Sequence, residues 1–199
     1  KLYRLLERDI PSEIRSKLQK NLPMTLQDTT KLNVFAQGIR QASDSPMHHD
    51  ISTSYKDSPK IMAAAGSMIS KAKNTPGFRG VLYSNYIDAG IKPYTDALND
   101  AGIKPLVFTG SLSQKDKKAL VDEYNSKSKK PKVLILSSSG GEGLDLKNTQ
   151  LMQLLEPHFN KSKLQQAEGR AIRFKSHESM PKDKRHVLVE EYRSTLPRT

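Results

Sequence analysis

The sequence predicts an α/β fold in which helices cover both faces of a parallel sheet, preceded by an α-helical extension. From Arg79 onward, short apolar runs of strand length alternate with longer segments of helical periodicity, a pattern typical of parallel sheets with crossover helices. Before Arg79 the apolar residues recur at helical spacing, without strand-like runs. We therefore expect a helical extension at residues 1–78 that packs on an α/β lobe at residues 79–199.

Helical periodicity marks each part of the extension. Leu2, Leu5 and Leu6 indicate a helix over Lys1–Asp9, and Pro11 interrupts it and starts a second helix, because proline is tolerated in a first turn. One further apolar stripe ends near Pro46 and another runs through Lys60–Lys73. The stripe residues are Leu32, Phe35, Ala36 and Ile39, then Ile61, Ala64, Ala65, Met68 and Ile69.

The lobe contains a series of strand-like runs with helix-like segments between them. The expected strands are Gly80–Ser84, Pro105–Phe108, Lys132–Leu136, Leu151–Leu155 and Val187–Tyr192. The expected helices are Ala89–Ala101, Ser113–Asn125 and Ser162–Ile172, and Ser113 with Asp116 resembles a capping box. Since ligands of such sheets bind at the carboxyl ends of the strands, the loops that follow these runs form the candidate site.

The charge of the chain favours a polyanionic partner. Its 199 residues include 33 Lys and Arg against 21 Asp and Glu, for a formal net charge of +12. Such an excess usually indicates nucleic acid, but a basic surface that binds nothing specific carries the same charge. Charge alone leaves both alternatives open.

Composition also excludes several kinds of site. The absence of cysteine excludes disulfides, cysteine-ligated zinc, iron–sulfur clusters and thiol catalysis. We expect no metal site, since the adjacent His48 and His49 have no evident further ligands. No apolar run approaches the roughly 20 residues of a membrane-spanning helix. We therefore expect no membrane partner and an intracellular protein, cytoplasmic if its source is a bacterium or a phage.

A segment rich in glycine and serine, Ser137–Leu146, follows the third expected strand. Its serines offer hydrogen-bond donors, and Gly140, Gly141 and Gly143 let a phosphate approach the backbone closely. A flexible loop would have the same composition. Neither the glycine pattern of dinucleotide-binding folds nor a P-loop occurs in the sequence.

Two arginines stand three positions apart in the segment Gln166–Arg173. In a helix, Arg170 and Arg173 would share one face. Their planar guanidinium groups suit the oxygens of a triphosphate. The spacing leaves open an exposed arginine pair that bridges to carboxylates such as Glu168.

Taken together and in order, these segments resemble the C-terminal RecA-like lobe of superfamily 2 helicases and nucleic-acid translocases. The matching segments are Val81–Asn85 for motif IV, Phe108–Ser111 for the Thr-Gly element, Ser138–Leu146 for motif V, and Gln166–Arg173 for the Gln-x-x-Gly-Arg-x-x-Arg form of motif VI. The resemblance covers roughly Gly80–Tyr192.

Within the superfamily, the sequence is most similar to the Swi/Snf-like branch. Glu156–Asn160 is similar to the acidic-Pro-x-aromatic-Asn step of that branch, and Phe35–Pro46 looks like the helix that precedes its second lobe. After motif VI, Phe174–His177 departs from the Ile-Gly-Gln of chromatin remodellers and looks more like the variants of phages and large DNA viruses.

The resemblance implies half of a nucleic-acid-dependent ATPase, either a helicase or a double-strand translocase. In that family ATP with Mg²⁺ lies between two RecA-like lobes, and an N-terminal lobe, in the same or a companion chain, holds the P-loop and most of the Mg²⁺ ligands. Arg170 and Arg173 would be arginine fingers, which accelerate phosphoryl transfer by about 10³–10⁵ in well-studied nucleotidases. Gly143, Asp145 and Gln166 would lie near the nucleotide.

The resemblance also implies contacts to a nucleic-acid backbone. The residues concerned are Thr109, Gly110, Ser137, Ser138 and Ser139, and phosphate contacts of this kind are independent of sequence and sensitive to salt. DNA is favoured over RNA as the track, although backbone contacts serve both. Without a P-loop, the chain alone is expected to hydrolyse no ATP. A non-enzymatic nucleic-acid-binding module and a regulatory RecA-like module are the alternatives.

Overall fold

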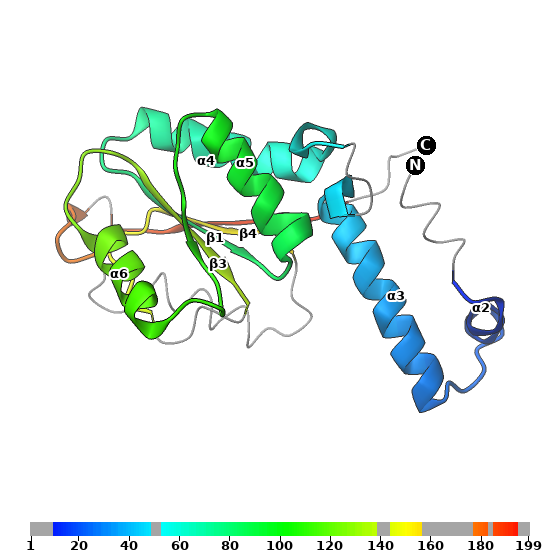
Figure 1. The fold of residues 1–199 in the computed structure, drawn as a ribbon. Coiled ribbons are helices and arrows are strands. Elements are labelled where there is room, and N and C mark those ends of the chain that lie inside the picture. The colour runs from blue at the N-terminus through cyan, green and yellow to red at the C-terminus, as the bar shows by residue number, and fades with distance from the viewer. Residues whose placement is uncertain (1–9, 49–52, 139–143, 157–176, 183–184, 195–199) are drawn as a thin grey trace.

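The computed structural model describes residues 10–48, 53–138, 144–156, 177–182 and 185–194. A five-stranded sheet forms the centre of these residues (Figure 1). Its strands are β1 (Arg79–Ser84), β2 (Leu106–Phe108), β3 (Lys132–Ser137), β4 (Leu151–Leu154) and β5 (Leu188–Glu191). Each of them lies within one residue of its expected bounds. For the buried strands β1, β3 and β4 the reason is that mainly apolar runs are the normal signature of strands covered on both faces.

All strand pairs are parallel, in the order β2–β3–β1–β4–β5. The central strand β1 pairs with β3 on one side and with β4 on the other, and it is buried along its whole length. The carboxyl ends of neighbouring strands therefore meet at one edge of the sheet. This arrangement confirms the predicted parallel α/β architecture.

Helices cover both faces of the sheet, as expected. On one face α4 (Pro59–Asn74) and α5 (Lys92–Asp100) pack together, and α6 (Gln114–Asn125) lies on the other (Figure 1). The first face buries a core that includes Ile61, Met68, Leu82, Tyr94, Leu98 and Ile135, and the second one that includes Val81, Phe108, Tyr124, Leu134, Leu146 and Met152. Helix α4 thus shares a core with the strands. The division near residue 78 stays a prediction.

The helix expected over Ala89–Ala101 is wrong in its first turn. A π turn, η3 (Ile87–Ile91), precedes α5 instead, and the Ile91 N–H donates to the Tyr86 carbonyl at 2.9 Å. Gly90 lies so close to Ser84 that a Cβ on Gly90 would overlap the Ser84 hydroxyl. This close approach of the chain to the end of β1 depends on a tertiary neighbour, which helical periodicity does not report.

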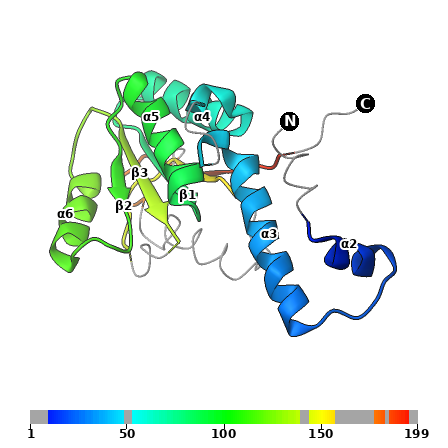
Figure 2. The same cartoon turned by 45° about the vertical axis from the view of Figure 1, so that its right-hand side comes forward.

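The N-terminal helices form an arm that leads away from the lobe. Figures 1 and 2 show α3 (Leu26–Asp44) extending outward, with α2 (Ser12–Gln19) near its far end. A capping box between Thr25 and Asp28 begins α3. Lys17 of α2 reaches Asp28 at 2.7 Å, and its hydrogen bond holds the pKa of that carboxyl well below its usual range.

Two 3₁₀ turns, η1 (Pro46–His48) and η2 (Tyr55–Asp57), lie between the arm and α4. The expected helices Lys1–Asp9 and Ser162–Ile172 fall outside the described residues.

Candidate functional site

The predicted phosphate-contacting residues of the described chain follow two neighbouring parallel strands. Thr109 and Gly110 come directly after β2, and Ser138 comes directly after β3, so all three lie at the same edge of the sheet. Gly110 and Ser138 are exposed and Thr109 is half-buried. Ser137, the last residue of β3, is only 2% exposed. Of the two serines, Ser138 is therefore the one that a phosphate can reach in this structure.

The loop after β2 is fastened to the first turn of α6. The hydroxyls of Thr109 and Ser111 lie 2.9 Å apart, and Lys117 donates to the Gly110 carbonyl at 3.4 Å. Ser113 caps the helix by accepting the Asp116 N–H at 3.2 Å, which confirms the serine half of the expected capping box. The Ser113 hydroxyl in turn donates to the Asp116 carboxylate at 2.7 Å.

Asp145 is exposed, although its neighbours Leu144 and Leu146 are buried in the core under α6. The side-chain amide of Asn125, at the end of α6, holds the backbone on both sides of Leu146. Its Nδ2 donates to the Asp145 carbonyl at 2.8 Å, and its Oδ1 accepts the Lys147 N–H at 2.8 Å. The Asp145 carboxylate is thus presented to solvent from a fixed backbone.

The other predicted site residues fall outside the described residues. They are Ser139, Gly143, Gln166, Arg170 and Arg173. Their roles stay predictions.

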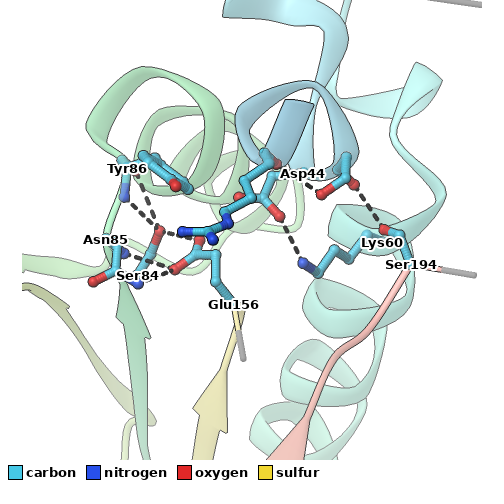
Figure 3. A network of polar contacts seen from close by, with 9 residues as sticks. Asp44, Lys60, Ser84, Asn85, Tyr86, Glu156 and Ser194 are labelled. Atoms are coloured by element: carbon cyan, nitrogen blue, oxygen red, sulfur yellow. Dashed lines mark hydrogen bonds and ion pairs between the residues drawn. The ribbon is translucent and has the colours of Figure 1, made fainter. Parts of the chain in front are cut away.

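A buried polar cluster lies beyond the end of β4, and the sequence analysis did not predict that its members meet. We call Asp44, Lys60, Ser84, Asn85 and Glu156 the Glu156 network (Figure 3). The Ser84 hydroxyl and the Asn85 N–H each donate to the Glu156 carboxylate at 2.7 Å. Lys60 forms an ion pair of 2.6 Å with Asp44, and both side chains are almost fully buried.

The Glu156 network joins the arm to the lobe. Asp44 is the last residue of α3, Lys60 lies in the first turn of α4, and Ser84 ends β1. Beside the network, the Ser194 hydroxyl donates to the Ser43 carbonyl at 2.8 Å (Figure 3). Sequence reasoning singled out Glu156 within a family motif, but no spacing in the chain pairs it with Asp44.

Both carboxyls of the network are shifted towards their neutral forms. Burial, with the nearby charge of Asp44, raises the pKa of Glu156 to about 8. Burial also raises the pKa of Asp44, against the attraction of Lys60. Asp44 Oδ2 has no hydrogen-bond donor as a partner among the described residues. A proton shared between Glu156 and Asp44 would supply that donor.

Two kinds of feature are absent from the residues that the structure describes. These residues hold no cluster of His, Asp or Glu able to bind a metal ion. Their helices are also too short or too polar to span a membrane.

Comparison with known proteins identifies the family. The model of the helicase conserved C-terminal domain matches residues 59–175. A protein of Acanthamoeba polyphaga mimivirus, provisionally named an ATP-dependent RNA helicase, is 33% identical over 89% of this chain, which spans 37% of that relative. A termination factor NPH-I homolog of African swine fever virus is 27% identical over 55% of this chain and 16% of its own length. These viral relatives agree with the predicted similarity to large-DNA-virus variants.

Solved structures show the same fold. The C-terminal domain of a Sulfolobus solfataricus SWI2/SNF2 ATPase matches with a TM-score of 0.64 and 16% identity, over 96% of this chain and 71% of that domain. The ATPase core of the same type, solved in complex with dsDNA, matches with a TM-score of 0.68 and 15% identity, over 95% of this chain and 37% of that core. The chain belongs to the helicase conserved C-terminal domain family, with the fold of the Swi2/Snf2-like second lobe.

Proposed function

We propose that this chain is the second motor lobe of a nucleic-acid-dependent ATPase whose P-loop lobe is a separate unit. The observation that carries this function is the extent of the family match, because residues 59–175 include every residue predicted to serve ATP or nucleic acid. The net charge of +12 supports a polyanionic track. The chain spans about a third of its mimivirus relative, so turnover is proposed for the larger protein.

The described part of the site fits a nucleotide in one respect. Asp145 offers an exposed carboxylate on a backbone fixed by Asn125, which suits a hydrogen-bond acceptor for a ribose hydroxyl. ATP, with Mg²⁺ held mainly by the first lobe, supplies the phosphoryl group whose transfer to water drives the motor. Arg170 and Arg173 would stabilise the negative charge that grows in the transition state.

Two further residues have proposed roles near the nucleotide. Gly143 would leave room for its close approach. Gln166 would link the nucleotide to the nucleic-acid site.

The edge of the sheet after β2 and β3 would bind the track. Thr109, Gly110 and Ser138 offer hydroxyl and backbone N–H donors side by side, as phosphate contacts require. Such contacts read no bases, so binding would weaken steeply with salt. We propose duplex DNA as the track, supported by the solved neighbour in complex with dsDNA, whereas the name of the mimivirus relative favours RNA.

ATP turnover by two proteins tests the proposed function. One is the isolated chain, and the other is the chain together with a P-loop lobe, in the same polypeptide or as a companion chain. We expect no turnover from the isolated chain, and turnover from the larger protein that duplex DNA stimulates more than duplex RNA does. Robust turnover by the isolated chain would contradict the proposal that ATP hydrolysis needs a separate P-loop lobe. Salt-sensitive DNA binding without any turnover in the larger protein would favour a non-enzymatic binding module.

A further inference from the structure

The stretch from Leu144 to Gln150 connects the glycine-rich loop to β4 without forming a strand or a helix. Its backbone N–H and C=O groups are therefore not paired by the regular hydrogen bonds of a helix or a sheet. Side chains from other parts of the chain hold it instead. We call residues 144–149, together with Arg79, Tyr124, Asn125, His177 and Ser179, the loop junction.

Asn125 makes the contacts closest to Asp145. Its Oδ1 accepts a hydrogen bond from the Lys147 N–H and its Nδ2 donates one to the Asp145 carbonyl, each at 2.8 Å. The side chain thus bonds the backbone as a neighbouring strand would. Between these two bonds Leu146 is fully buried in the core under α6. Because burial alternates from Leu144 to Leu146, the side chain of Asp145 faces out. The amide of Asn125 thus fixes the residue whose carboxylate is exposed.

Arg79 holds the same region from the start of β1. Its guanidinium donates to the Lys147 carbonyl at 3.2 Å and to the Ser126 carbonyl, just past α6, at 2.9 Å. Only 6% of Arg79 is exposed, and it lies 6.0 Å from the centre of the Tyr124 ring. The end of α6, on which Asn125 lies, is therefore held without the Asn125 side chain.

The far end of the junction joins residues that follow motif VI. His177 Nε2 donates to the Thr149 carbonyl at 2.7 Å, and the Tyr124 and Thr149 hydroxyls lie 3.0 Å apart in the core. Asn148 and Ser179 exchange two hydrogen bonds of 2.8 and 3.0 Å. The segments after motifs V and VI are thus bonded to each other.

From this geometry we propose that Asn125 is a positioning residue for the nucleotide, acting through the backbone of Asp145. It does not touch the nucleotide; it sets where the Asp145 carboxylate stands relative to the sheet. Arg79, Tyr124 and His177 fix the surrounding junction and maintain its fold. The role rests on the proposed function, in which Asp145 faces the ribose.

The test uses the complete motor, this chain with its P-loop lobe, and the variants Asn125→Ala and Asn125→Asp. Asn74→Ala is the matched control, since Asn74 also ends a helix but its side chain donates to Ser70 of its own helix. Asn125→Ala is expected to raise KM for ATP by about three- to tenfold, the cost of lost hydrogen bonds, with kcat little changed. Asn125→Asp keeps the acceptor for the Lys147 N–H, so its KM for ATP should lie between those of Asn125→Ala and the wild type. The control should match the wild type.

Two readouts separate positioning from general stability. The preference for ATP over 2′-deoxy-ATP and 3′-deoxy-ATP should fall in Asn125→Ala, because the ribose contact is the one displaced. Amide hydrogen exchange at Lys147 should become faster in the same variant while exchange in β1 and β3 is unchanged. An unchanged exchange rate at Lys147 would contradict the claim that the Asn125 side chain holds this backbone. Faster exchange with an unchanged ribose preference would overturn the positioning role.

Failure of the proposed function has a different signature. A wild-type protein without ATP turnover overturns that function, and with it the role of Asn125 towards a nucleotide. In that case faster exchange at Lys147 in Asn125→Ala would still establish the junction as a purely structural one.

Discussion

Two buried polar networks on the α4 side of the sheet differ in how completely their charges and hydrogen bonds are balanced. In the Gln153 network, formed by Ser67, Tyr94, Gln153, Glu190 and Tyr192, an amide within β4 is the centre. Gln153 accepts from the Tyr94 hydroxyl at 2.6 Å and donates to Glu190 at 2.8 Å and to the Ala64 carbonyl at 2.9 Å. Two residues beyond the end of β4, the Glu156 network places the buried Glu156 carboxyl near Asp44, whose carboxylate pairs with Lys60.

The two networks also shift their acids in opposite directions. Burial acts to raise the pKa of Glu190, but donors from Tyr192, Gln153 and Ser67 outweigh it, so the pKa is lowered. For Glu156 burial prevails, and the pKa rises to about 8. The Gln153 amide, whose hydrogen-bond partners are all present, is expected to stabilise the fold. The stability of the Asp44–Glu156 pair, between the arm and the lobe, is expected to depend on protonation.

The largest expected difference in stability is between variants of Lys60, in the Glu156 network, and of Lys71, which pairs with Glu190 beside the Gln153 network. Lys60→Met leaves the Asp44 carboxylate buried without its cation, so at pH 8 we expect the free energy of unfolding to fall by about 3–5 kcal/mol. Lys71 pairs with Glu190 at 3.5 Å and its side chain is 37% exposed. Lys71→Met should therefore cost less than about 1 kcal/mol. Urea unfolding of both variants measures the difference, and equal losses would erase the contrast between the networks.

The pH dependence of stability should have opposite signs in the two networks. Folded Glu156 retains its proton up to pH of about 8, while the unfolded chain releases it near 4.5, so unfolding free energy falls as pH rises between these values. Glu190 stabilises the fold above the ordinary carboxyl range and loses that contribution as pH falls through it.

Two isosteric variants isolate these slopes. Glu156→Gln should flatten the urea midpoint between pH 5 and 8, and Glu190→Gln should flatten its decline on the acid side. Asp44, whose pKa is also raised by burial, remains in the first variant, so a small residual slope is expected. A Glu156→Gln protein with the wild-type slope would show that Glu156 is ionised in the folded state.

The smallest effect concerns a single hydroxyl. Tyr94→Phe removes the donor to Gln153 and leaves its buried Oε1 unpaired, for a loss of about 1–3 kcal/mol. Tyr55→Phe removes a hydrogen bond of the same 2.6 Å length, but to Asp100 at the surface, and should cost less. Thermal unfolding of the pair measures the effect of burial. Equal shifts would mean that water reaches the Gln153 network.

The sheet was predictable because its buried strands are mainly apolar runs. Lys132–Leu136, for example, was expected as a strand and is one, extended by Ser137. The edge that gathers Thr109 and Ser138 followed from the parallel order of those strands. The cap at Ser113 could also be predicted, since it depends on residues three positions apart.

The joints between elements were not predictable in the same way. Asp44 and Lys60 lie on helices whose polar positions normally face solvent, and only the fold brings them to Glu156. Asn125 was expected at the end of a helix, but its partners Asp145 and Lys147 are set by the path of the chain after β3. Polar side chains that pair over long sequence distances leave no periodic signal.

ATP hydrolysis by the complete motor, this chain with its P-loop lobe, with and without duplex DNA, tests the second-lobe function most directly. The variants are Arg173→Ala and, as a control, Arg193→Ala, whose exposed guanidinium pairs with Glu191 outside the family match. We expect Arg173→Ala to lose about 10³-fold or more in DNA-stimulated turnover while still binding DNA, and Arg193→Ala to match the wild type. Wild-type turnover in Arg173→Ala would contradict the arginine-finger role and, with it, the proposed motor lobe.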